Sequence, residues 1–226
     1  MTSFGSAKHP PMGTLREVFG PAGDRASAVA ALLYQYEIDR EFPDAVMLEA
    51  KAAPQAVEES AVAGRLDLRD RVMITIDGAS SKDLDDAVSL ERDGLGRWVL
   101  GVHIADVSHY VRPGSALDLE AWERGTSVYF ADQVVPMLPR ELSNGICSLN
   151  PRVDRLALSC VMTLTPEGEV VDHTVAKSVI RTTERMTYED CNALLAHSDP
   201  ALAERYARIL PMLEDMAALS RVLEGR

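Results

Sequence analysis

The sequence predicts an α+β fold in which a helical stretch precedes a β-rich domain that ends in further helices. Three observations support this prediction. Apolar residues recur at helical spacing after Asp24, β-rich runs replace that spacing after residues 67–70, and helical spacing returns from about Tyr188. With 226 residues, of which 46% are hydrophobic, the chain is long and apolar enough to bury a core.

Residues 24–64 are predicted to form a helical connector rather than an independent domain. Before them, residues 13–25 ("GTLREVFGPAGDR") are typical of a short strand that runs into a Gly/Pro turn, as the last strand of an upstream element would. Asp24 is the expected N-cap of a helix, because four apolar residues follow at helical spacing: Val29, Leu32, Leu33 and Tyr36. Two short helical segments are expected to start at Pro43 and Pro54 and to end near Gly64.

The middle of the chain is predicted to form strands. Residues 71–77 are expected to form one strand, and residues 86–107 a hairpin whose turn contains the glycines of residues 93–96. A short helix is expected over 117–125, followed by a long Pro/Asn/Gly stretch over 135–154. Loops of that length inside compact domains are usually functional or disordered. Two more strands are then expected, over 155–165 and 170–181.

Helices are predicted for the C-terminal part. The capping-box pattern "TYED" (187–190) indicates a helix from about Tyr188. Further on, Pro211 is expected to kink a helix or to lie in its first turn. The apolar face of that helix carries four residues: Tyr206, Ile209, Leu210 and Leu213. No later segment covers this face, so we expect it to be exposed, the chain to be cut at both ends, and the chain by itself to be marginally stable or self-associating.

Composition restricts the classes of function. A formal net charge of −12 argues, taken alone, against a nucleic-acid partner, because proteins that bind phosphates usually carry a basic face. The three cysteines form no C-x-x-C pair and leave an odd number, which suggests neither a disulfide framework nor a zinc site and is typical of a reducing cytosol. The sequence has no 18-residue apolar run and no signal-peptide pattern at its start, so we predict a cytoplasmic protein without membrane insertion.

The segment "TIDGASSKDLDDAVSL" (75–90) concentrates negative charge in the four residues Asp77, Asp83, Asp85 and Asp86. Neighbouring carboxylates disfavour each other's ionisation unless a positive charge lies among them. A bend at Gly78 would direct hard oxygen ligands towards one point, which suits Mg²⁺ or Mn²⁺. A solvated acidic turn is an open alternative from the spacing alone. An EF-hand is excluded, because Ala87 and Val88 stand where that loop requires Asp or Asn and then Gly.

Several motifs resemble one known family. In order and spacing, the chain resembles the catalytic RNB domain of the ribonuclease II / ribonuclease R family, and ribonuclease R most, through "TIDGASSKDLDDAVSL", "GVHIADVSHYV", "RGTSVYF", "VVPMLPRELSNGICSLNPRVDRLALSC" and "RTTERMTYEDCNALL". The resemblance implies a mixed sheet with flanking helices. It assigns residues 65–226 to the N-terminal part of the catalytic domain, 24–64 to the connector, and 1–23 to the end of an upstream cold-shock-like barrel.

The resemblance also implies an activity. The family hydrolyses single-stranded RNA processively from the 3′ end and releases nucleoside 5′-monophosphates. Its catalytic, metal-binding aspartates correspond to Asp77, Asp83, Asp85 and Asp86, with Asp85 expected to be the least replaceable. In two-metal chemistry one ion activates the attacking water and the other stabilises the leaving 3′ oxygen.

Limits on that activity follow from the same resemblance. We expect Mg²⁺ or Mn²⁺ to be required, no small-molecule cofactor, a monomeric parent protein, and no activity from this chain alone. In the family, the domain continues beyond the end of this chain and contributes an active-site arginine there. The alternative function is that of a non-catalytic RNA-binding or scaffold fragment.

Other side chains carry weaker expectations. Tyr129 matches the family tyrosine that packs on a base near the RNA 3′ end, although an isolated tyrosine of this kind is more often buried in a core. Phe130 is expected in the core. His103 and His109, on either side of Asp106, are interpreted as structural residues rather than a catalytic cluster. Contact with phosphate and loop-fixing salt bridges are both open for three arginines: Arg140, Arg152 and Arg155.

Overall fold

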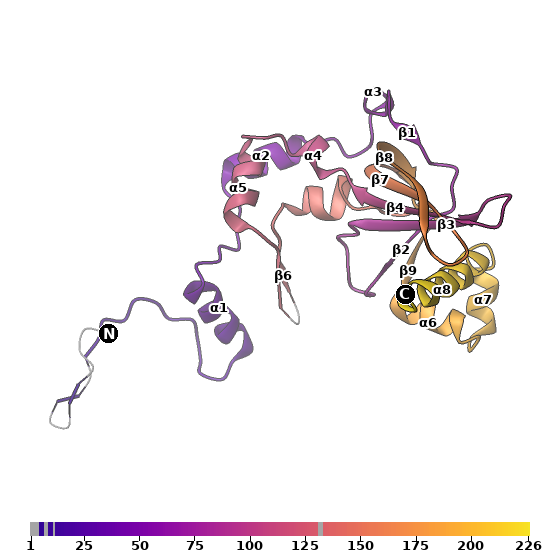
Figure 1. Ribbon diagram of the computed structural model, residues 1–226. Coiled ribbons are helices and arrows are strands. Elements are labelled where there is room, and N and C mark those ends of the chain that lie inside the picture. The colour runs from indigo at the N-terminus through magenta and orange to yellow at the C-terminus, as the bar shows by residue number, and fades with distance from the viewer. Residues whose placement is uncertain (1–4, 7–8, 11, 131–132) are drawn as a thin grey trace. The chain divides into compact units, whose positions relative to one another are not determined.

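The computed structural model describes residues 5–6, 9–10, 12–130 and 133–226. The chain divides into two compact units, Met1–Phe42 and Pro43–Arg226 (Figure 1). Each unit is described by itself below. Among the described residues, no helix combines the length and the apolar character that crossing a membrane requires.

The first unit contains the helix α1 (Arg25–Gln35). As predicted, Asp24 is its N-cap, and the carboxylate accepts a hydrogen bond from the backbone N–H of Ser27 at 2.9 Å. Only half of the predicted apolar stripe is buried, namely Val29 and Leu33.

The prediction of a strand at the start of the chain was wrong. Residues 13–20 form neither a strand nor a helix, and Leu15 and Val18 are exposed. A strand needs a neighbour for its backbone N–H and C=O groups, and the described part of this unit supplies none to residues 13–20. The assignment of residues 1–23 to a barrel stays a prediction.

The second unit is built on a mixed sheet of seven strands in the order β1-β8-β7-β4-β3-β2-β9. β1 pairs with β8, and β2 with β9, in parallel, whereas the other neighbours are antiparallel. The strands are β1 (Leu66–Asp67), β2 (Ile74–Asp77), β3 (Asp86–Arg92), β4 (Trp98–Ala105), β7 (Asp154–Leu164), β8 (Val170–Arg181) and β9 (Glu184–Thr187). The expectation of a mixed sheet with flanking helices is therefore confirmed.

Short elements surround this sheet. A separate two-stranded ribbon consists of β5 (Val128–Tyr129) and β6 (Val134–Val135). The predicted long loop contains a π-helical turn, η1 (Glu141–Ile146). The helices are α2 (Asp44–Ala52), α3 (Glu59–Val62), α4 (Val107–Tyr110), α5 (Ala116–Arg124), α6 (Tyr188–Leu195), α7 (Pro200–Arg205) and α8 (Leu210–Glu224). In Figure 1, α6, α7 and α8 gather beside β9.

The C-terminal helix packs against the sheet, which corrects a prediction. Pro211 lies in the first turn of α8, as one of the two alternatives had it. Of the apolar face that we expected to be exposed, Tyr206, Ile209 and Leu213 are each at most 5% exposed, and Leu210 is half-buried. Its partners in the core include Ile74 and Leu90, which come from strands more than a hundred residues earlier in the chain. The described residues therefore cover this face themselves, and the predicted self-association loses this reason.

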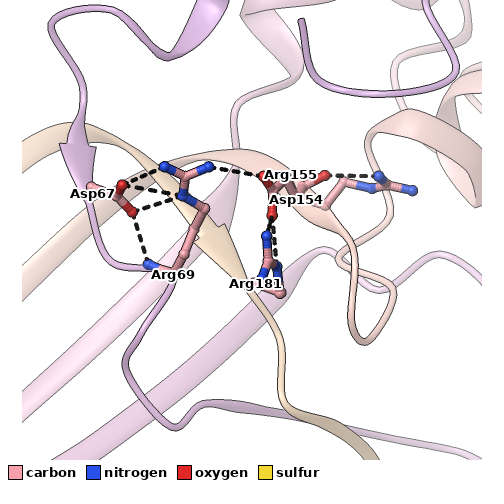
Figure 2. Close-up of polar contacts among 5 residues, drawn as sticks. All are labelled: Asp67, Arg69, Asp154, Arg155 and Arg181. Carbon is pink, nitrogen blue, oxygen red and sulfur yellow. Dashed lines mark hydrogen bonds and ion pairs between the residues drawn. The ribbon is translucent and has the colours of Figure 1, made fainter. Parts of the chain in front are cut away.

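A network of ion pairs fastens β1 to the sheet (Figure 2). Arg69 lies between two carboxylates, with Nε 2.9 Å from an oxygen of Asp67 and Nη1 3.1 Å from an oxygen of Asp154. Asp154 also accepts from Nε of Arg181 at 2.8 Å. Single surface ion pairs contribute little, but a carboxylate shared by two guanidinium groups ties three segments together.

The two histidines and the aspartate between them are structural, as interpreted. His103 on β4 is fully buried, and its two ring nitrogens lie 3.0 and 2.7 Å from the hydroxyl oxygens of Ser89 and Ser159. Asp106 forms a buried ion pair of 2.7 Å with Arg65, and Nδ1 of His109 lies 3.4 Å from the same guanidinium. Burial, followed by the charge of Arg71, lowers the pKa of His103 from 6.5 to about 4.

The covered face of α8 can be tested by truncating one side chain. Leu213→Ala should lower the free energy of unfolding by about 2–5 kcal/mol, because it leaves a cavity in a closed core. Leu119→Ala on the exposed side of α5 is the matched control and should change the free energy of unfolding by less than about 0.5 kcal/mol. Denaturant unfolding measures both. Equal, small losses in the two variants would mean that α8 does not pack on the sheet.

His103 predicts a pH dependence of stability. Because its pKa is lower in the folded chain, the unfolded state binds a proton first as the pH falls. The stability that neutral His103 contributes is therefore complete above pH 6.5 and declines by about 3 kcal/mol as the pH falls to about 4. His103→Gln cannot titrate, so the difference in unfolding free energy between wild type and this variant should shrink over that range. A difference that is constant from pH 7 to pH 4 would contradict the assignment.

Candidate functional site

The four predicted aspartates lie at one end of the sheet, around the connection between β2 and β3. We call residues 78–85 the acidic loop. Asp77 is the last residue of β2 and is half-buried, and Asp86 is the first residue of β3 and is exposed. Within the loop, Asp83 is half-buried and Asp85 is exposed. The strands thus fix two of the carboxylates, and the loop carries the other two.

One arginine holds the first half of the acidic loop. Nη2 of Arg185, on β9, donates to the backbone carbonyl oxygens of Gly78, Ala79 and Ser81 at 3.1, 2.9 and 2.7 Å. Sequence reasoning did not identify Arg185, which lies 104–107 residues further along the chain. Its only signal was its place in the motif "RTTERMTYEDCNALL".

The second half of the loop is held by the long segment that contains η1. The hydroxyl of Ser148, a fully buried residue, donates to the carbonyl of Lys82 at 2.8 Å and accepts from the N–H of Leu84 at 3.1 Å. The N–H of Leu149 donates to the carbonyl of Leu84 at 2.8 Å. The acidic loop is therefore anchored through its backbone, whereas its carboxylates face other partners.

The carboxylates act on one another electrostatically. Burial, then the charge of Asp86, raises the pKa of Asp77, while the guanidinium of Arg185 opposes that rise. The pKa of Asp85 is also raised; although solvent reaches its carboxylate, the surrounding protein still disfavours the charged form, and the charges of Asp83, Asp86 and Asp77 add to that effect. The site therefore carries more negative charge than its own cations neutralise.

The carboxylates of the site fit a metal ion in their chemistry but not in their present placement. Over residues 5–6, 9–10, 12–130 and 133–226, no three His, Cys, Asp or Glu side chains are placed to hold an ion as they stand. The donors nevertheless fit Mg²⁺ or Mn²⁺ in kind, since they are hard carboxylate oxygens in an uncompensated negative field. Two of them, Asp85 and Asp86, are exposed. That all four converge on one point stays a prediction.

Tyr129 lies beside the acidic loop. Its hydroxyl donates to Oδ2 of Asp83 at 2.8 Å, and this hydrogen bond is the main reason why the pKa of Tyr129 is raised. The side chain is 64% exposed, so the alternative of a buried core tyrosine was wrong. Phe130, expected in the core, is only half-buried. Tyr129 ends β5 and Phe130 follows it, so both residues belong to the two-stranded ribbon and not to the main sheet, which explains why they do not enter its core.

Both aromatic residues line a cleft of about 490 Å³. The acidic loop contributes Lys82 and Asp83 to its lining, and the segment of η1 contributes Asn144 and the preceding Arg140. The cleft thus combines two aromatic rings, two cationic side chains and one of the predicted metal ligands.

The three loop arginines divide between the two alternatives. Arg155 is buried and fixes the long loop, with Nε 2.7 Å from the carbonyl oxygen of Ser148 and Nη2 3.2 Å from that of Gly145. Arg152 forms a 2.5 Å ion pair with Glu184. Arg140 is exposed at the cleft. Only Arg140 is placed where a phosphate in the cleft would meet it.

Comparison with known proteins shows the family of this fold. A family model described as RNB domain matches residues 65–226. Ribonuclease R 1 of Lactococcus lactis subsp. lactis is 51% identical over 213 residues, which are 94% of this chain and 26% of that protein. Ribonuclease R of Thermotoga maritima is 44% identical over 209 residues, which are 92% of this chain and 29% of that protein. The chain therefore spans less than a third of the length of these two relatives.

A solved structure shares the fold. The structure of Mycoplasma genitalium RNase R in complex with ribose-methylated single-stranded RNA matches with a TM-score of 0.83 and 31% sequence identity. The match covers 93% of this chain and 32% of that one. Since the family model spans residues 65–226, which contain the whole sheet and the acidic loop, the chain belongs to the RNB domain family.

Proposed function

We propose that this protein is a metal-dependent exoribonuclease that hydrolyses single-stranded RNA processively from its 3′ end to nucleoside 5′-monophosphates. The observation that carries the proposal is the 2.8 Å hydrogen bond between Tyr129 and Asp83. It places the residue expected to contact a base against a residue expected to bind the ion. Tyr129 and Asp83 belong to different motifs and lie 46 residues apart in the sequence, and both line the same cleft.

The carboxylates supply the ion site of this proposal. Asp77, Asp83, Asp85 and Asp86 would hold Mg²⁺, or Mn²⁺ in its place. When bound, such an ion supplies Lewis-acid chemistry, which makes water a better nucleophile and neutralises charge on the phosphate that is cleaved. The chain's own part is to hold these oxygens on an anchored loop.

The cleft supplies the RNA contacts. Tyr129 and Phe130 offer rings on which bases of any sequence stack, as a degradative enzyme needs. Lys82 and Arg140 offer positive charge to the backbone phosphates. This local arrangement answers the objection from the net charge of −12, because RNA would meet the cleft and its ion rather than the average surface.

A non-catalytic RNA-binding or scaffold role is the second candidate. One observation favours it, namely that no three donor side chains among the described residues are placed to hold an ion as they stand. Titration with Mg²⁺ or Mn²⁺ separates the two functions, and no binding at millimolar ion would support the scaffold. That the 226 residues alone lack processive activity, that the parent protein is monomeric and that it is cytoplasmic stay predictions.

Asp85 tests the reaction. In the complete protein, Asp85→Asn should abolish hydrolysis and spare RNA binding, because it removes one ligand charge with little change of shape. Asp172→Asn, an exposed position on β8, is the matched control and should leave the rate unchanged. Release of mononucleotides from a labelled single-stranded RNA measures both variants. An Asp85→Asn protein with normal turnover would refute the proposed reaction.

Tyr129 tests the RNA contact. Tyr129→Ala should change the length of the final oligonucleotide and weaken RNA binding by about 1–3 kcal/mol, because a stacking surface is lost. Tyr129→Phe retains the ring but not the hydrogen bond to Asp83, and should keep the wild-type end product. Gel analysis of the digestion products and a binding titration give the two readouts. If the Ala variant stops at the same length as wild type, Tyr129 does not contact the base.

A further inference from the structure

We propose that Arg185 is the positioning residue of the acidic loop, and that the affinity of its carboxylates for a divalent ion depends on the hydrogen bonds that Arg185 makes to the loop backbone. This inference rests on the proposed function, which supplies the ion. It adds a residue that neither the motif reading nor the chemistry of the carboxylates identifies.

The sheet register explains how Arg185 reaches the loop. β9 pairs in parallel with β2, with Arg185 opposite Thr75 and Thr187 opposite Asp77. Side chains alternate along a strand, so Thr75, Asp77 and Arg185 lie on the same face of the sheet. Arg185 is level with Thr75, two residues before Asp77. From there its guanidinium extends towards the carbonyls that follow Asp77. β9 pairs directly with β2, so no other strand lies between Arg185 and the end of β2, where the loop begins.

The contacts are concentrated on one nitrogen. Nη2 lies within 3.1 Å of three carbonyl oxygens, those of Gly78, Ala79 and Ser81. Nε is buried and has no hydrogen-bond partner, so the carbonyl contacts of Nη2 compensate for the partial burial of this guanidinium. A cationic donor between three converging carbonyl dipoles reduces their mutual repulsion. Arg185 therefore determines the path of residues 78–81.

A fixed backbone favours ion binding because fewer residues of the loop lose conformational freedom when the ion binds. With residues 78–81 held by Arg185 and Lys82 and Leu84 held by Ser148, binding requires only rotation of carboxylate side chains. Without Arg185, the first half of the loop would also have to be ordered, and that entropy cost would be subtracted from the affinity.

The charge of Arg185 acts in the opposite direction. Its guanidinium stabilises ionised Asp77, and by itself it repels a divalent ion. Removing Arg185 thus has two effects of opposite sign on ion affinity. We expect the anchoring effect to dominate for two reasons. The net charge of the four carboxylates stays negative with Arg185 in place. Among the described residues, no other side chain holds the carbonyls of Gly78 and Ala79.

Titration with Mn²⁺ in the absence of RNA is the first readout, in the complete protein. Arg185→Met should bind Mn²⁺ at least tenfold more weakly than wild type. Arg185→Lys retains a donor and the charge and should be intermediate. Arg97→Met is the matched control, because Arg97 pairs with Asp93 in the hairpin turn at the other end of β3, and it should bind as wild type does. Equal or tighter binding by Arg185→Met would overturn the inference, since the charge effect would then dominate.

Hydrogen exchange without any metal is the second readout. The N–H of Ser81 donates to the carbonyl of Gly78 at 3.0 Å, within the anchored segment. Peptides covering residues 78–84 should exchange at least tenfold faster in Arg185→Met, while peptides from β7 should be unchanged. Unchanged exchange in the loop, or an equal acceleration in β7, would show that Arg185 does not act on the loop specifically and would overturn the inference.

Asp85→Asn separates failure of this inference from failure of the proposed function. If wild type binds Mn²⁺, Asp85→Asn does not, and Arg185→Met binds normally, the function stands and the inference is wrong. If wild type itself binds no Mn²⁺, the proposed function fails and the link from Arg185 to ion affinity fails with it. A last contrast supports positioning: excess Mn²⁺ should restore hydrolysis in Arg185→Met but not in Asp85→Asn, and a lack of restoration would overturn it.

Discussion

Repulsion among neighbouring carboxylates is the constraint around which this end of the molecule is built. Four aspartates stand within a stretch of ten residues, and the pKa of two of them is raised in part by the charges of the others. Side-chain charge relieves this repulsion only in part, since the guanidinium of Arg185 opposes the rise in the pKa of Asp77. Arg185 and Ser148 form hydrogen bonds to the backbone between the aspartates, and the negative charge of the carboxylates stays in place.

Eight of the chain's nineteen arginines form ion pairs away from the acidic loop, which limits where positive charge is available. Ion pairs to Asp or Glu engage Arg65, Arg69, Arg71, Arg92, Arg97, Arg124, Arg152 and Arg181. Arg155 is buried against carbonyl groups. The cationic side chains at the cleft are Lys82 and Arg140. The described side chains thus offer little positive charge beside the acidic loop, in agreement with the acidic composition.

Local signals predicted local structure well. The strand over 170–181 and the helix from Tyr188 were predicted at their observed bounds, because turn residues and a capping pattern mark those positions. The prediction failed where an element depends on a distant partner. Residues 13–20 have strand composition but no neighbour to pair with, and the apolar face of α8 is covered by strands that no local pattern connects to it.

The candidate site shows the same division. The four aspartates are visible in the sequence as a charge cluster, and the resemblance to a family gave them a role. The part played by Arg185 could not be predicted, because it follows from the parallel pairing of β2 with β9. Likewise, a serine in a long polar segment gives no sign that it will be fully buried against residues 64 and 66 positions earlier.

The separation of these anchors along the chain sets an order for the assembly of the site during synthesis. Ser148 emerges from the ribosome 64 residues after Leu84, whereas Arg185 emerges 107 residues after Gly78. At about 5–20 residues per second, the first half of the acidic loop waits roughly 5–20 seconds for its anchor. During that interval β2 also lacks its parallel partner. A nascent chain therefore carries its aspartates long before it can hold them in place, and β9, the last strand of the sheet, brings the anchor for the first half of the loop.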